Sequence, residues 1–526
     1  MACTAETGRE RVEWQVWAEG QRGNCGFRSE MTEPDSAIGD SLKFMQRNWY
    51  WVLGVSALVV VPCLWHRHIE AGDLGSHVYN AWLAQLIAKG QAPGLYVAPQ
   101  WHNILFDVML LHVANWFGFA AAEKIVVAIC VLIFFWGAFA FVGAVTDRAP
   151  WTLTSCIAML AYGYCFNMGF MNYYLSLGLG FLCLALVWAD DGPRNWIPAV
   201  LIAVLVMAAH PMGLLWVIGV VVYRAIRPAL PGAVKLVVPL AVVVACTALR
   251  WYVHRSSAIL ADFYNPAPFR SIGVDQLVLY GTRYQFLAAA ALIFGIACFV
   301  LDVVARLREP GYWKRLEVPL ELYLILFCAA SFAPENLRFS LHAAWVGMLI
   351  SRLTAISAIV GLCVLGCMRP RTWHFAGFAA LALIFFAFLY QDTGKLNRLE
   401  TNAETLLSKV PTGTRVIPNI YAEPGSRLPF IVHIADRACV GRCFIYSNYE
   451  PSSNQFRVRI AKGGSWLASS SPDDANDMQG GGYEIQESDL PAKLLYQCDP
   501  QDRTKLCLRD LTEGDTTGNP EFQSDE

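Results

Sequence analysis

Long apolar stretches recur along most of the chain. Each has about the length of a helix that crosses a bilayer, which takes roughly 20 apolar residues. By this criterion the sequence predicts about eleven membrane spans in an α-helical polytopic membrane protein. We place these spans at 48–65, 124–145, 151–167, 170–189, 195–209, 211–227, 235–252, 286–305, 318–333, 339–367 and 373–390.

A long polar loop, 66–123, separates the first two spans. Apolar positions recur at helical spacing after Asp73, which predicts a short amphipathic helix on the membrane surface that ends at Gly90. The stretch 104–119 is apolar enough to cross the membrane but contains Asp107 and other polar residues. We therefore expect it to be a second interfacial or re-entrant piece of the same loop.

The composition divides the chain into three parts. We interpret 1–46, which is polar and mixed in charge, as a disordered cytoplasmic extension, and 47–391 as the transmembrane domain. The tail, 392–526, is polar and predicts a soluble α/β or mostly β domain. Within it we expect a helix over 396–409 and strands at 415–418, 430–434, 443–446, 456–460 and 493–497.

Lys and Arg are concentrated in alternate connections between the predicted spans, near 148, 194, 224–235, 306–315 and 369–371. The positive-inside rule assigns these connections to the cytoplasm, and it places the first loop and the tail outside. An odd number of spans agrees with this orientation. The pattern therefore predicts a bacterial inner (plasma) membrane protein whose tail faces the periplasm, with most of its histidines on the same side.

The composition adds two constraints. Of the residues, 56% are hydrophobic and 16% charged, and a net charge of −2 gives no basic surface for nucleic acid. Most of the 16 cysteines lie in apolar segments, but four lie in the tail and could form two local disulfides in an oxidising compartment. Free thiols or a zinc site are the alternatives for this set: Cys439, Cys443, Cys498 and Cys507.

Asp73 and His77 are the candidate catalytic residues. They are four positions apart, so a helix that begins near Asp73 places both on one face. An acid beside the membrane surface is costly and rare, which favours a functional role. The alternative is that Asp73 caps the helix.

The first loop, Gly72-Asp73-Leu-Gly-Ser-His77…Asn80-Ala…Ile87-Ala-Lys-Gly90, resembles that of the GT-C glycosyltransferases. These polytopic enzymes, of the protein mannosyltransferase and aminoarabinose transferase kind, take sugar from a polyprenyl-phosphate carrier at the outer membrane face. The resemblance implies that Asp73 is the base toward the acceptor and that transfer inverts the anomeric carbon. Leu74 stands where several subfamilies have a second acid, so a divalent metal, Mg or Mn, is an optional cofactor.

Glycosyl transfer also needs cations for the departing phosphate and a pocket for the substrates. The predicted phosphate ligands are three arginines on the outer side: Arg338, Arg270 and Arg283; Arg352 lies further along one predicted span. The predicted substrate pocket comprises Asn80, His102, Asn167, Asn172 and Tyr173.

The sequence therefore predicts a glycosyltransferase that moves a sugar from a polyprenyl-phosphate donor to a glycan, lipid or protein acceptor. Its partners are the lipid-linked sugar, the acceptor and the bilayer, with no nucleic acid. One alternative is a transporter or lipid flippase in which Asp73 and the arginines are gating or coupling charges. Another is a membrane-anchored binding protein whose tail binds the ligand.

Overall fold

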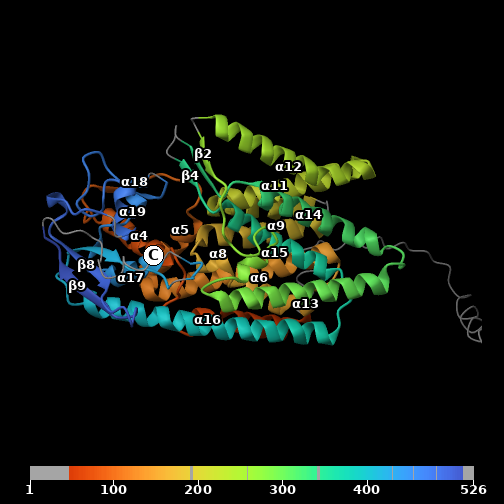
Figure 1. The fold of residues 1–526 in the computed structure, drawn as a ribbon, viewed down its shortest axis with the longest axis horizontal. Helices are drawn as coiled ribbons and strands as arrows, with labels where there is room; N and C mark the ends of the chain where they lie inside the picture. The colour runs from red at the N-terminus through yellow and green to blue at the C-terminus, as the bar shows by residue number, and fades with distance from the viewer. Residues whose placement is uncertain are drawn as a thin grey trace, which may run out of the picture.

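The computed structural model describes residues 47–189, 193–256, 259–339, 344–423, 425–428, 431–453, 455–480 and 483–512, so the extension predicted over 1–46 lies outside the described residues. The chain is mostly helical. Its long helices run side by side in an elongated bundle, and the tail gathers at one end of that bundle (Figure 1). We call this the domain end.

Seven segments of the described chain are long and apolar enough to cross a membrane. They lie in α6 (Phe119–Thr146), α9 (Met171–Ala189), α11 (Pro211–Ile226), α12 (Gly232–Arg255), α13 (Thr282–Arg306), α15 (Leu349–Gly366) and α16 (Thr372–Leu407). Shorter apolar helices are α3 (Trp49–Leu64), α5 (Leu105–Phe117) and α10 (Pro193–Ala209), and α14 (Tyr312–Phe332) packs beside α15. The chain therefore has the character of a helical membrane protein, and the number of eleven spans stays a prediction.

Two predicted spans are not single helices. The stretch 151–167 forms η1 (Trp151–Leu153), α7 (Thr154–Ala161) and α8 (Tyr164–Asn167). The prediction of one span over 339–367 was wrong, because α15 begins only at Leu349. The preceding residues form β3 (Asn336–Phe339) and β4 (Ala344–Val346), which make an antiparallel sheet with β2 (Ile259–Asp262). Hydropathy alone does not distinguish a short apolar strand from the start of a helix.

The first loop and the tail form the domain end. The loop contributes α4 (Leu74–Ala88), which matches the predicted amphipathic helix, and β1 (Leu95–Val97). The tail has a four-stranded sheet in the order β6-β5-β8-β9, with β5 parallel to β6 and β8, and β9 antiparallel to β8. The four strands of this sheet are β5 (Arg415–Asn419), β6 (Phe444–Ile445), β8 (Ala492–Gln497) and β9 (Leu506–Asp510). The tail has a fifth strand outside this sheet, β7 (Val458–Ile460).

The strand predicted over 430–434 was wrong. This segment contains η4 (Ile431–His433) and the start of α17 (Ile434–Cys439). The other short elements of the tail are α18 (Glu450–Ser453), α19 (Pro472–Gly480) and η5 (Glu487–Asp489). One disulfide joins Cys439 to Cys443 at the end of α17. The other joins Cys498, just after β8, to Cys507 in β9.

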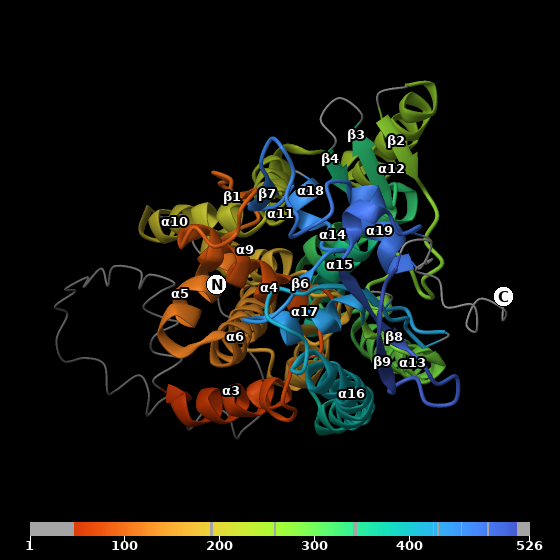
Figure 2. The same ribbon diagram turned by 90° about the vertical axis from the view of Figure 1, so that its left-hand side faces the viewer.

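The tail is not separate from the rest of the chain. Helix α16 is continuous through the boundary predicted between 391 and 392, and it extends into the tail. Strand β1 of the first loop pairs with β7 of the tail, Leu95 opposite Ile460. Helices α4 and α17 lie together at the domain end (Figure 2). Elements far apart in the sequence therefore build this end jointly.

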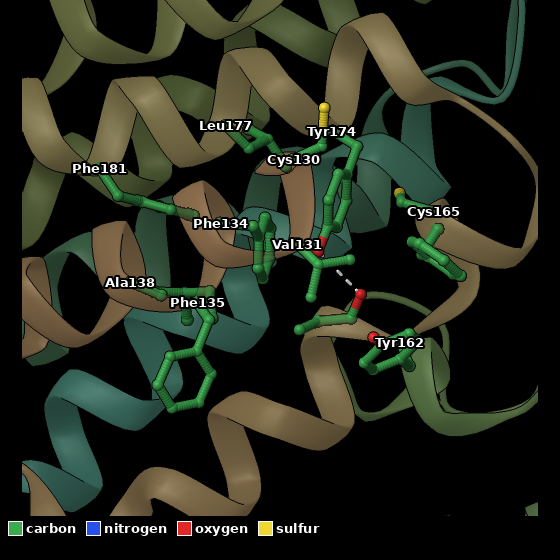
Figure 3. Packing of buried hydrophobic residues seen from close by; sticks show 14 of the residues in the cluster. Cys130, Val131, Phe134, Phe135, Ala138, Tyr162, Cys165, Tyr174, Leu177 and Phe181 are labelled. Atoms are coloured by element: carbon green, nitrogen blue, oxygen red, sulfur yellow. Dashed lines mark hydrogen bonds between the residues drawn. The ribbon is translucent and has the colours of Figure 1, made fainter. Parts of the chain in front are cut away.

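Close packing of α6 against α9 fixes the middle of the bundle (Figure 3). The rings of Phe134 and Tyr174 stack with centroids 4.5 Å apart, and the Tyr174 hydroxyl donates to the carbonyl of Ala161. A Cβ on Gly137 would lie 2.3 Å from the Gly178 carbonyl oxygen, so the helices approach here at backbone distance. This contact holds the first turn of α9, which carries Asn172 and Tyr173, at the domain end.

Candidate functional site

Backbone contacts fix the position of Asp73. The amide of Gly72 donates to the Asn167 carbonyl (2.8 Å), and the amide of Asp73 donates to the Met168 carbonyl (3.1 Å). Gly169 has a φ of +77°, and a Cβ there would lie 2.3 Å from the Asp73 nitrogen. The loop before α4 is therefore seated against the turn between α8 and α9.

The carboxylate of Asp73 is not used to cap α4. Asp73 occupies the N-cap position, but its side chain makes no capping hydrogen bond within the described chain. An N-cap aspartate normally accepts a hydrogen bond from an amide of the first turn. Asp73 therefore does not act as the helix cap that the sequence offered as an alternative. Its carboxylate is 22% exposed and can contact a ligand.

Two histidine–aspartate pairs flank Asp73. On α4, His77 Nδ1 lies 2.7 Å from Asp107 Oδ1. From the tail, His433 Nδ1 lies 3.0 Å from Asp436 Oδ2, and its Nε2 lies 4.0 Å from Asp73 Oδ1. The His433 side chain is 2% exposed, and its Nε2 is buried without a hydrogen-bond partner among the described residues. Each imidazole is thus oriented by a second carboxylate.

These contacts set the charges. Burial lowers the pKa of His433, but attraction to Asp436 and Asp73 outweighs it and raises that pKa to about 9. Burial also lowers the pKa of His77, and Asp107 reverses this and raises it to about 9. Burial raises the pKa of Asp73, and the neighbouring cations oppose that rise. The net effect is a raised pKa for Asp73. Near neutral pH both imidazoles are therefore cations, and of the three groups only the Asp73 carboxyl, in its ionised form, can accept a proton.

The tail supplies two further groups. Glu450 accepts a hydrogen bond from the Ser76 hydroxyl (2.7 Å), and burial raises the pKa of this carboxyl to about 7 although His77 lowers it. The ring of Tyr449 lies 5.8 Å from that of His433. A carboxyl whose pKa lies near neutral pH is therefore held beside α4 and interacts with both histidines.

Arg352, on the first turn of α15, is the arginine that interacts electrostatically with Asp73. Its guanidinium lies over the rings of Phe170 (4.7 Å) and Tyr173 (5.6 Å), and Nη1 is 3.8 Å from Met212 Sδ. Its Nε is buried and has no hydrogen-bond partner within the described chain. A guanidinium held by aromatic rings, without a carboxylate partner in the described residues, is suited to bind an anion.

The three predicted phosphate ligands have their contacts elsewhere. Arg338 is exposed on β3, in the sheet with β2. Arg270 donates to the carbonyl of Asn265 (3.3 Å), and Arg283 pairs with Asp392 of α16 at 2.5 Å. The structure therefore does not bring these arginines together with Asp73.

Asn172 and Asn80 lie at the edge of the site and organise it. Asn172 donates to Asp107 Oδ2 (2.8 Å) and accepts from the amide of Phe106 (2.9 Å), which joins α9 to α5. Asn80 accepts a hydrogen bond from Asn448 Nδ2 (2.9 Å), which joins α4 to the tail. Both were predicted to line the substrate pocket, and their observed contacts are within the protein.

Asn167 lines a small pocket with Gly72 and His433, whereas His102 lies on the surface. Asn167 is buried, donates to the carbonyl of Tyr162 (2.8 Å) and accepts from the Tyr280 hydroxyl (3.3 Å). His102 is exposed, and its carbonyl accepts from Gln100 Nε2 (2.9 Å). Tyr173, by contrast, donates its hydroxyl to the Arg352 carbonyl (2.7 Å) and lies at the site.

His433, Asp436 and Glu450 were not predicted as site residues. His433 and Asp436 are three positions apart, a spacing that places two side chains on one helix face. That signal was present, but the predicted strand over 430–434 contains His433 and ends before Asp436, so no shared helix face was predicted for the two residues. Nothing in the sequence around Glu450 indicates its contact with α4.

A buried ion cluster holds α17 in place. Arg437 lies 2.6 Å from Glu123, 2.6 Å from Glu400 and 3.5 Å from Glu70, and it also donates to the Ile69 carbonyl. These partners come from the first loop, α6 and α16. Arg437 of the tail therefore contacts the first loop, α6 and α16, and it lies only four residues after His433.

No group of three or more His, Cys, Asp and Glu side chains in the described ranges is arranged to hold a metal ion, and the Mg or Mn prediction remains a prediction. In comparisons with known proteins, no family model, no curated protein and no solved structure matches this chain.

Proposed function

We propose that this protein is a membrane glycosyltransferase that transfers a sugar from a polyprenyl-phosphate donor to an acceptor, with Asp73 as the general base. The observation that carries the proposal is the uncapped Asp73 carboxylate at the domain end, where three cationic side chains converge on it: His77, His433 and Arg352. A carboxylate beside several cations in a partly buried site is typical of a catalytic centre for anionic substrates.

In the proposed reaction Asp73 accepts the proton of an acceptor hydroxyl while the hydroxyl oxygen bonds to the anomeric carbon of the sugar. The bond from that carbon to the phosphate oxygen breaks, and its electron pair leaves with the phosphate. Arg352 binds the phosphate as this charge develops. One displacement with one base inverts the anomeric carbon, as the GT-C likeness also implies.

The two protonated histidines support this assignment in a second way. His433 and His77 each have a carboxylate on Nδ1, which leaves Nε2 to donate toward the site. They therefore favour the ionised form of Asp73, which is the form that accepts a proton, and they attract the anionic donor. Because His433 belongs to the tail, the tail takes part in the reaction centre itself rather than only in acceptor binding.

The cellular setting belongs to the same proposal. The distribution of Lys and Arg predicts that the domain end lies outside a bacterial plasma membrane, where it would meet the lipid-linked donor and a glycan, lipid or protein acceptor. The donor's hydrocarbon chain would remain in the bilayer while its phosphate reaches Arg352.

The test is sugar transfer by purified protein in vesicles that contain labelled polyprenyl-phosphate sugars, with and without Mg²⁺ or Mn²⁺. Asp73→Asn keeps the size of the side chain but removes the base, so we expect transfer to be lost. Asp473→Asn, at an exposed position of α19, is the matched control and should leave transfer unchanged. Arg352→Met should weaken the use of the donor, seen as a higher KM.

Two outcomes would count against the proposal. Equal transfer by Asp73→Asn and the wild type would remove Asp73 as the base. No transfer with any donor, together with a change in lipid or ion flux across the vesicles in Asp73→Asn, would favour the transporter or flippase.

A further inference from the structure

An apolar cavity of about 280 Å³ lies among the spanning helices, away from Asp73. It is bounded by α7, α13, α14, α15 and α16, and by η3 (Val274–Leu277) of the loop before α13. Its lining is almost entirely aliphatic and aromatic, and it includes three glycines: Gly273, Gly295 and Gly361.

Water is a poor occupant for this cavity. The Tyr323 hydroxyl is already bonded to the Ile272 carbonyl (2.9 Å), and Cys156 provides the other polar side-chain atom of the lining. A buried water needs two to four polar partners, and apolar cavities without them stay dry or take apolar guests. The chemistry of the lining therefore fits a hydrocarbon.

Close packing does not require Gly295 of α13 or Gly361 of α15. A Cβ on Gly295 would meet its nearest atom, Leu365 Cδ1, at 3.7 Å, and one on Gly361 would meet the Tyr323 ring at 3.4 Å. Both are ordinary contacts. Gly273 differs, because its Cβ would lie 2.6 Å from the Ala358 nitrogen. At Gly295 and Gly361 the missing side chain keeps the cavity open instead of allowing backbone contact.

The cavity borders the outer surface of the helix bundle. Ile296 lines it and is 53% exposed. Helix α13 packs mainly against α16 and η3, whereas α14 packs mainly against α12 and α15, so we expect the opening between α13 and α14. A chain from the surrounding bilayer can enter there sideways.

The cavity and the proposed donor site lie on opposite faces of α15. Gly361 is nine positions after Arg352, and nine residues at 3.6 per turn make two and a half turns. A donor whose phosphate lies at Arg352 is therefore on the other side of this helix.

We propose that the cavity holds one acyl chain of a bilayer phospholipid. A cavity of about 150 Å³ accommodates benzene, so about 280 Å³ has room for a hydrocarbon segment of roughly ten carbons. The inference that the cavity holds a hydrocarbon rests on its lining alone. The inference that this hydrocarbon is an acyl chain, and not the chain of the sugar donor, rests on the proposed function.

The test is photolabelling of the full chain in phosphatidylethanolamine and phosphatidylglycerol vesicles that contain a phospholipid with a diazirine in one acyl chain. We expect adducts on the cavity-lining parts of α13 and α15. Gly295→Leu with Gly361→Leu should fill the cavity and abolish these adducts. Gly219→Leu is the matched control, because Gly219 is exposed on α11 and a Cβ there meets nothing within 4 Å.

Ala291→Leu, which adds less volume to the lining, serves as a second variant if the double variant does not fold, and it should reduce the adducts. Adducts unchanged by either variant, or spread evenly over the lipid-facing helices of the wild type, would overturn the proposal. A filled cavity that raises the KM for the polyprenyl donor would assign the cavity to the donor's chain instead. Failure of sugar transfer in the wild type as well as in every variant would overturn the proposed function, and the labelling result could still be interpreted.

Discussion

Replacing Arg437 tests whether the tail is fixed in place by one buried cation. Its guanidinium faces Glu123, Glu400 and Glu70, and the side chains of all four residues are 6% exposed or less. Arg437→Met keeps much of the apolar stem and removes the charge. The variant then buries three carboxylates without the cation that compensates them.

The size of the effect follows from this geometry. Removal of one partner from a buried ion pair destabilises a protein by about 3–5 kcal/mol, and three carboxylates place Arg437→Met toward the upper end. Arg67→Met is the matched control. Arg67 is 68% exposed and pairs with Glu404 on α16 at 3.1 Å, so its loss should change stability by less than about 1 kcal/mol.

The assay is thermal unfolding followed by tryptophan fluorescence, together with sugar transfer. We expect a large fall in the midpoint for Arg437→Met, with loss of transfer because α17 also carries His433. Burial already raises the pKa of Glu70, so the uncompensated carboxylates should take up protons readily, and the loss of stability should be smaller at pH 5 than at pH 8. Equal, small shifts for both variants would refute the reasoning.

Two further changes test the site. Gly75→Ala would place a Cβ 2.1 Å from the His433 carbonyl oxygen, so we expect it to displace α17 and abolish transfer, whereas Gly54→Ala, with nothing within 4 Å, should not. The pKa of Glu450 is raised from its ordinary 4.5 to about 7, so its contribution to stability is complete below 4.5 and is lost as the pH rises through 7, by at most about 3 kcal/mol. Glu450→Gln should flatten that decline in unfolding midpoints measured from pH 5 to pH 8. The control Glu487→Gln, at an exposed position, should leave the decline unchanged. An unchanged slope in Glu450→Gln would contradict the raised pKa of Glu450.

The composite nature of the site affects how the tail can be studied. Asp73 and His77 come from the first loop, Arg352 from α15, and His433 and Glu450 from the tail. Since β1 pairs with β7 and α16 continues into the tail, an isolated tail would lack both a strand partner and its supporting helix. Experiments on the reaction should therefore use the full chain.

The sequence by itself determined the features that depend on local pattern. Apolar stretches of helical length predicted most of the long helices, and the periodicity after Asp73 predicted α4. Four cysteines in a polar tail predicted two local disulfides, and short β-rich stretches predicted β5, β6, β7 and β8. In each case the signal lies within about 20 neighbouring residues, which is the range over which hydropathy and spacing carry information.

The tertiary structure decided which side chains meet. Asp73 and His433 are 360 positions apart, and no pattern in a single sequence reports that α17 docks on α4. The same limit explains the arginines. The positive-inside rule predicted that Arg338, Arg270 and Arg283 lie on the outer side, but only packing shows that Arg283 is paired with Asp392. Arg352 is held by two aromatic rings, without a described carboxylate partner. Charge and burial are properties of the folded surroundings, so the groups that could act on a substrate were fixed only when distant segments came together.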